Sequence, residues 1–178
     1  MPVDVIEIAR SIGVRVIKES DIGVLTRGEF GRAYCYINEW FIVYDSSISM
    51  ERSRLTIAHE LGHITLAHQL ANVRYTAANP ERVFKRRHPA EVQADAFAQR
   101  LLCPACVLHG LGLTTAEEIA KYCCVDLDVA EKRLERLKVL DKRNKYFTDP
   151  LEKELYDKYS EYIEEVRAER EKSIILQK

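Results

Sequence analysis

The sequence predicts an α+β fold, in which a small sheet near the N-terminus is followed by several helices. Two observations carry this prediction. Residues 33–45 contain two β-rich runs, and apolar residues recur at helical spacing in 50–69, 89–103 and 150–172. The 178-residue chain is 47% hydrophobic and 31% charged, so it can bury one good core, or one core and a small appendage.

The N-terminal elements are short. Residues 2–12 are expected to form a helix, and residues 14–19 alternate as a strand does. Within 33–45, the residues Asn38 and Glu39 separate the two β-rich runs and predict a tight hairpin turn. We therefore expect a small antiparallel sheet.

The next segments are expected to be helical. Ser49 is a good N-cap for a helix over about residues 50–69. Residues 71–88 contain Asn, Pro and the basic run KRR and are expected to form a solvated loop. Pro89 is placed for the first turn of a second helix, which Pro104 ends.

The C-terminal part is expected to be entirely helical. Residues 114–138 predict two short helices with the spacing of a helix-turn-helix. The residues at the start of the second of these helices are acidic, which is unfavourable for contact with DNA phosphates. Asp149 and Glu152 open a long amphipathic helix over 150–172, which could pack within the chain or hold a homodimer.

The helix over 50–69 carries half of a possible metal site. His59 and His63 are four residues apart, so both imidazoles lie on one face and can bind one ion. Glu60 follows His59 directly and points to one side of that pair. There it can act as a general base on a water molecule without itself being a ligand, which is the division of roles in an HExxH hydrolase.

A catalytic zinc ion needs a third protein ligand. The best candidate is Glu91 on the next helix, and Asp95, four residues later, lies on the same face. Asp95 is expected to accept a hydrogen bond from the outer ring nitrogen of a ligand histidine. Gly62 is costly inside a helix and indicates that another element packs close to it. His68 is expected to cap the helix end rather than to be a fourth ligand.

Bulk properties exclude several function classes. The formal net charge of −1 gives no general attraction to nucleic acid or anionic membranes. No apolar run is long enough to span a bilayer, and the N-terminus lacks the features of a signal peptide. The five cysteines form an odd set that suits a reducing compartment, so we expect a cytoplasmic protein. For Cys103, Cys106, Cys123 and Cys124, a second metal site or a redox pair is the alternative, and buried, inert side chains are the expectation.

The sequence also resembles a known family. LTIAHELGHITLAH (55–68), followed by EVQADAFAQRLLCP (91–104), is similar to the ImmA/IrrE-type metallopeptidases, and the resemblance spans roughly residues 40–138. It implies a zincin-like (gluzincin-like) fold, one zinc ion at His59, His63 and Glu91, and Glu60 as the catalytic base. It also implies cutting or inactivation of a helix-turn-helix repressor in a mobile element or stress response. Cys103 stands where the family usually has methionine.

The resemblance also sets expectations for the organisation of the chain. Residues 1–112 are expected to form the metallopeptidase domain and residues 113–178 a helical region. By analogy with zincins, the strand WFIVYD (40–45) should lie along the cleft and pair with an extended substrate. Four residues are candidates for stabilising the oxyanion, and the sequence does not choose among them: Tyr75, His88, His109 and Tyr122.

These features predict a cytoplasmic zinc endopeptidase that cleaves one regulatory protein, with a helix-turn-helix repressor as the expected partner. Two alternatives remain open. The chain could be a protein- or DNA-binding regulator that keeps the metal site without efficient proteolysis, or a toxin–antitoxin component that uses the same site. The cleaved bond and the activating signal are not encoded in any recognisable motif.

Overall fold

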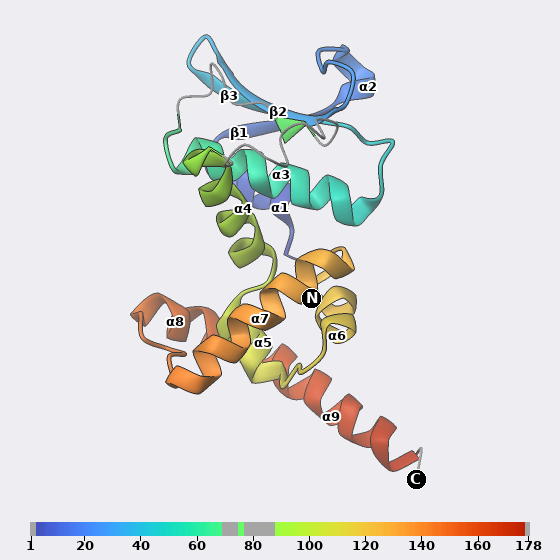
Figure 1. The fold of residues 1–178 in the computed structure, drawn as a ribbon, viewed down its shortest axis with the longest axis vertical. Helices are drawn as coiled ribbons and strands as arrows, with labels where there is room; N and C mark the ends of the chain where they lie inside the picture. Colours follow the sequence, from blue (N-terminus) through green and yellow to red (C-terminus); the bar gives the residue numbers. More distant parts are fainter. Residues whose placement is uncertain (1–2, 69–74, 77–87, 177–178) are drawn as a thin grey trace. The chain divides into compact units, whose positions relative to one another are not determined.

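The computed structural model describes residues 3–68, 75–76 and 88–176 (Figure 1). The described residues form two compact units, one from Val3 to Leu102 and one that begins at Cys103. The sequence placed the division after residue 112 instead. The difference arises because the helix that follows Pro104 packs against the C-terminal helices. That the two units are separate domains stays a prediction.

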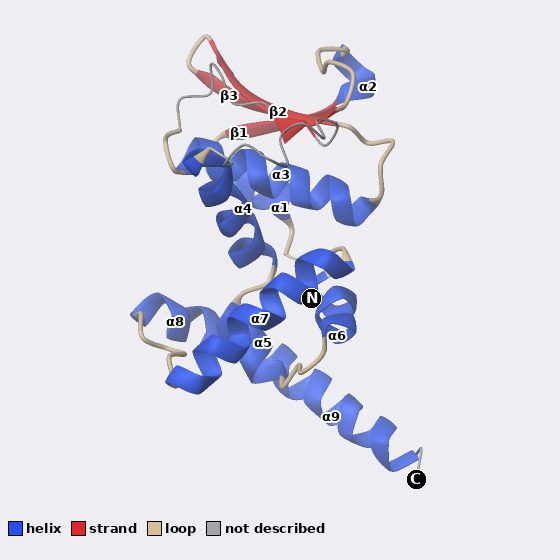
Figure 2. Cartoon of the chain, in the orientation of Figure 1, coloured by secondary structure: helices blue, strands red, loops and turns tan. Residues whose placement is uncertain are grey.

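The first unit contains both strands and helices, as expected for an α+β fold (Figure 2). Its described elements, in chain order, are α1 (Val5–Ser11), β1 (Val14–Lys18), α2 (Glu19–Ile22), β2 (Glu29–Tyr36), β3 (Glu39–Tyr44), α3 (Met50–Thr65), β4 (Tyr75–Thr76) and α4 (Pro89–Leu102). The predicted helix and strand types are therefore confirmed. Most of the predicted loop 71–88, including the KRR run, lies outside the described residues, and its residues 75 and 76 form β4.

The sheet has the strand order β1-β3-β2-β4. The hairpin of β2 and β3 is antiparallel, and so is the pair of β2 and β4. The expectation of a purely antiparallel sheet was wrong in one respect, because β1 pairs with β3 in parallel. The hairpin turn also lies one residue earlier than expected. Ile37 and Asn38 both have positive φ angles, of 48° and 61°, as a two-residue turn matching the strand twist requires.

The position of β3 overturns one expectation about the cleft. β3 lies between β1 and β2 and pairs with both, so it has no edge to offer an extended peptide. Its apolar side chains are instead central to the core, and Ile42 and Val43 are fully buried. A near-continuous apolar run is typical of an interior strand, which explains why WFIVYD was the clearest strand signal.

Helix α3 packs on one face of this sheet (Figure 1). Ile57 and Leu61 on α3 and Ile42 on β3 are all fully buried. The helix approaches β2 closely at Gly31. A Cβ atom there would lie 2.3 Å from the Thr56 methyl group and 3.1 Å from the Val43 carbonyl oxygen. Glycine at this position therefore permits the contact between helix and sheet.

The described regular elements of the second unit are all helices. Its elements are α5 (Ala105–Leu111), α6 (Ala116–Cys123), α7 (Leu127–Arg143), α8 (Pro150–Lys158) and α9 (Ser160–Leu176). Thr115 and Glu118 form the capping box that begins α6. The Arg170 guanidinium pairs with Glu118 and donates to the Leu111 carbonyl oxygen, which joins α9 to the ends of α5 and α6.

The single long helix expected over 150–172 is interrupted at Tyr159, which is the C-cap of α8. Both α8 and α9 pack against α5. A Cβ atom on Gly110 would meet both Tyr156 of α8 and Ile163 of α9, so one small residue receives side chains from both helices. Ile163 and Val166 are buried within the unit. A homodimer through this helix stays a prediction.

We expect Gly31→Ala to destabilise the fold by roughly 1–3 kcal/mol, because the added methyl overpacks the contact between β2 and α3. Chemical denaturation of both proteins measures this difference. Thr56→Ser removes the methyl group that the added Cβ atom would meet and keeps the hydroxyl that donates to the Arg52 carbonyl oxygen. The double variant should regain part of the loss, and an undiminished loss would contradict the proposed contact.

Candidate metal centre

Helix α3 carries three of the predicted site residues into the protein interior. The Ser49 hydroxyl accepts a hydrogen bond from the Arg52 N–H and begins the helix, as predicted. His59, Glu60 and His63 are each no more than 3% exposed. Buried polar side chains of this kind are costly without partners, so their contacts define what the site can do.

Helix α4 brings the fourth residue, Glu91, because it packs unusually close to α3. A Cβ atom on Gly62 would lie 3.2 Å from the Ala94 Cα atom and 3.1 Å from the Phe97 ring. The close approach that Gly62 indicated is therefore present. Glu91 lies in the first turn of α4 and is 7% exposed.

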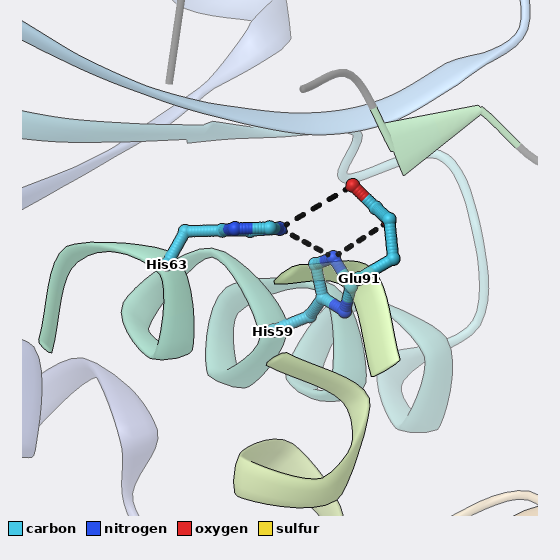
Figure 3. Close-up of side chains that lie close together, drawn as sticks. All are labelled: His59, His63 and Glu91. Atoms are coloured by element: carbon cyan, nitrogen blue, oxygen red, sulfur yellow. Dashed lines mark hydrogen bonds and ion pairs between the residues drawn. The ribbon is translucent and has the colours of Figure 1, made fainter. Parts of the chain in front are cut away.

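The donor atoms of three side chains converge between the two helices (Figure 3). The Nε2 atoms of His59 and His63 are 3.0 Å apart. The Glu91 carboxylate lies 3.5 Å from the His59 Nε2 and 3.6 Å from the His63 Nε2. In the described part of the chain, this is the one cluster of histidine, cysteine and acidic side chains with the proximity that a metal ion requires.

The outer nitrogens of both rings also have partners. Asp95 Oδ1 lies 2.9 Å from His59 Nδ1, which is the contact predicted for this residue. His63 Nδ1 lies 2.9 Å from His68 Nδ1. The ring of His68 in turn contacts the side-chain oxygen of Gln93, at 2.9 Å from its Nε2. His68 was expected only as a helix cap, and an exposed glutamine on a helix gave no sequence signal.

The two rings have opposite pKa shifts. Burial disfavours the charged form of His59, but Asp95 and Glu91 outweigh it and raise the pKa of that ring to about 9. Burial and the charge of His59 lower the pKa of His63 to about 4.

These residues fit a divalent zinc ion. Four ligands at about 2.0–2.1 Å in a tetrahedron are separated by about 3.3 Å, and the three donor separations lie on either side of that value. Two neutral imidazoles and one carboxylate are also a usual ligand set for a catalytic zinc. A cation there would lie beside the Glu91 carboxylate. That these three residues are the ligands stays a prediction.

Glu60 is held apart from this donor set. One of its carboxylate oxygens accepts the Ala33 N–H of β2 at 2.8 Å, so the side chain extends from α3 to the sheet. Burial raises the pKa of Glu60 to about 7. A carboxyl group that titrates near neutrality is suited to accept and return a proton.

The four candidates for oxyanion stabilisation occupy different places. Tyr75 lies on β4 opposite Gly31, and Gly31 is next to Glu60. His88 accepts the Ala90 N–H through Nδ1 and so caps the start of α4. His109 and Tyr122 belong to the helical unit. The register of β4 thus makes the Tyr75 backbone a neighbour of the site.

The sequence also matches the profile of a known protein family. A profile of the IrrE N-terminal-like domain, peptidase family M78, matches residues 9–135. The chain belongs to this family. The M78 match covers the sheet, both site helices and most of α7, so it extends beyond the unit that holds the donor cluster. No curated protein matches the chain significantly. Among the described residues, no helix of this M78 protein is long and apolar enough to cross a membrane.

The raised pKa of Glu60 predicts that the stability of the metal-free protein depends on pH. The folded pKa of Glu60, about 7, lies above the ordinary value of 4.5, so protonated Glu60 stabilises the fold. This contribution is complete below pH 4.5 and is lost as the pH rises through 7. With chelator present, we expect Glu60→Gln to be more stable than wild type at pH 8, by at most about 3 kcal/mol.

Urea denaturation at pH 8 and at pH 4.5 measures this effect, and the two proteins should become equally stable at the lower pH. Glu131→Gln is the control, because Glu131 is an exposed residue of α7. Equal stability of Glu60→Gln and wild type at pH 8 would show that the Glu60 carboxylate is not desolvated as described.

Proposed function

We propose that the chain is a zinc-dependent endopeptidase that cleaves a regulatory protein. The observation that carries this proposal is the convergence of His59, His63 and Glu91 beside a buried glutamate, in a chain that belongs to a peptidase family. One zinc ion, held by these three residues, would act as a Lewis acid and lower the pKa of water in the site to about 7.

The chain's own residues supply the remaining steps. Glu60 is the general base that accepts a proton from the attacking water and returns it to the leaving amine. Its hydrogen bond to the Ala33 N–H holds the carboxylate in place, which limits the reorganisation needed during the reaction. Asp95 orients His59 through the ring nitrogen that faces away from the donor cluster.

The substrate would align with β2 rather than β3. Strand β2 lies next to β3 in the sheet, and its residue Ala33 donates its N–H to the Glu60 carboxylate. Among the described residues, β4 pairs with β2 only at Glu29 and Gly31, so the part of the strand from Ala33 onward has an edge beyond that pairing. An extended peptide recognised through backbone hydrogen bonds would fit such an edge.

We propose a helix-turn-helix repressor as the substrate class and the cytoplasm as the compartment. The ImmA/IrrE-type motifs support the first, and the odd cysteine set supports the second. Direct DNA binding through α6 and α7 is disfavoured, because Asp128 and Glu131 are exposed near the start of α7. A regulator without proteolysis remains the competing function, and one variant separates the two.

Purified protein should carry about one zinc ion per chain. We expect Glu60→Gln to keep that zinc and to lose cleavage of a repressor encoded beside this chain, because the amide cannot accept the proton. Metal analysis and gel electrophoresis of the mixed proteins provide the two measurements. Regulation by Glu60→Gln as strong as by wild type would reject hydrolysis as the function.

Matched variants make the result specific. His63→Ala should lose both zinc and cleavage, whereas Glu131→Gln, on the exposed face of α7, should keep both. A tight, salt-sensitive complex of the wild type with duplex DNA would instead favour the regulator.

A further inference from the structure

His63 has a second partner that the proposed hydrolysis does not use. Its Nδ1 faces the Nδ1 of His68 at 2.9 Å, and the two rings are close to perpendicular, at 70°. His68 lies beyond the end of α3, whose last residue is Thr65. The backbone must therefore turn sharply to return the ring of His68 to the helix.

The turn is built around Ala67. The His68 N–H donates to the His63 carbonyl oxygen, and the Ala67 N–H donates to that of Ile64, as in a Schellman motif. Ala67 has a φ of 52°, in the region that usually favours glycine. A non-glycine residue there costs roughly 1 kcal/mol. The strain accompanies a geometry that places the His68 ring against His63.

The hydrogen-bond directions from His63 through His68 to Gln93 follow from the groups at the two ends of this contact. With zinc bound, His63 Nε2 would supply a lone pair, so the proton of neutral His63 would be on Nδ1, where it would be donated to His68 Nδ1. His68 then carries its own proton on Nε2 and donates it to the Gln93 oxygen.

Gln93 provides an acceptor anchored on the second site helix. It lies on α4 between Glu91 and Asp95. Helix α4 therefore supplies Glu91, the third donor of the cluster. It also supplies Asp95 as the acceptor facing His59 Nδ1, and Gln93 as the acceptor facing His68 Nε2. If Gln93 donated instead, His68 would have to donate to His63, and His63 Nε2 would carry a proton. The Gln93 oxygen, as placed, thus matches the form of His63 that can bind a metal.

Resting on the zinc site proposed above, we infer that His68 and Gln93 are positioning residues that hold His63 in the Nδ1-protonated tautomer with Nε2 directed at the metal. They do for His63 what Asp95 does for His59, with two neutral side chains in place of a carboxylate. His68 touches neither the Glu91 carboxylate nor the reacting atoms in this role.

The test compares substitutions that remove or retain the acceptor. In His68→Leu the acceptor is lost, and we expect the zinc dissociation constant of the full-length protein to rise about 10- to 100-fold, as for other ligand-orienting partners. In His68→Asn, the side-chain oxygen takes the place of Nδ1, and the affinity should return close to that of wild type. Chelator competition measures both.

Gln93 offers an independent matched pair. Gln93→Glu keeps an acceptor of the same length and should preserve zinc affinity, whereas Gln93→Leu should weaken it. Nitrogen-15 NMR of the imidazoles gives a readout that does not depend on activity. In the zinc-free proteins, His63 should be mainly the Nδ1-protonated tautomer in wild type and His68→Asn, and a mixture of tautomers in His68→Leu. Thermal unfolding identifies any variant that fails to fold.

The outcomes separate the two proposals. The positioning role alone would be overturned if wild type and folded His68→Leu bound zinc with equal affinity. It would also be overturned if His68→Leu and His68→Asn lost zinc affinity equally. Absence of zinc from the wild-type protein would overturn the proposed function and this role with it. Zinc binding without peptidase activity would reject hydrolysis and leave the positioning role supported.

Discussion

The close packing of α3 against α4 is the contact on which the candidate site depends. Gly62 removes the side chain that would hold the two helices apart, with Ala94 and Phe97 directly opposite. Because the helices meet there, Glu91 on one reaches the two imidazoles on the other. Glycine inside a helix costs about 1 kcal/mol, and the close approach that it permits brings the donor cluster together.

Charge explains why these side chains must act together. Two imidazoles and several carboxylates lie in a region that excludes most solvent, and the pKa values of His59, His63 and Glu60 all move away from their ordinary values. Isolated charges in such a region would be costly. A single dication beside the Glu91 carboxylate would meet the electrostatic demand of the cluster, in agreement with membership of a peptidase family.

The predictions that succeeded rest on the periodicity of apolar residues within one segment. Most of those that failed concern how segments pack or pair with one another. Helical spacing located α3 and α4, and β-rich runs located the hairpin. The parallel pairing of β1, the interior place of β3 and the break at Tyr159 were not predicted, since each depends on segments distant in sequence. The turn at Ile37 and Asn38 was misplaced by one residue because β-branched Ile37 resembles a strand residue.

The sequence by itself determined which residues could share a face: His59 with His63, and Glu91 with Asp95. The spacing of four follows from the geometry of any α-helix, so no tertiary information was needed. Only the tertiary structure decided that these faces meet, that Glu60 reaches the Ala33 N–H, and that His68 turns back to His63. Those contacts require two segments to approach within hydrogen-bonding distance, which depends on packing between elements rather than on the periodicity of either one.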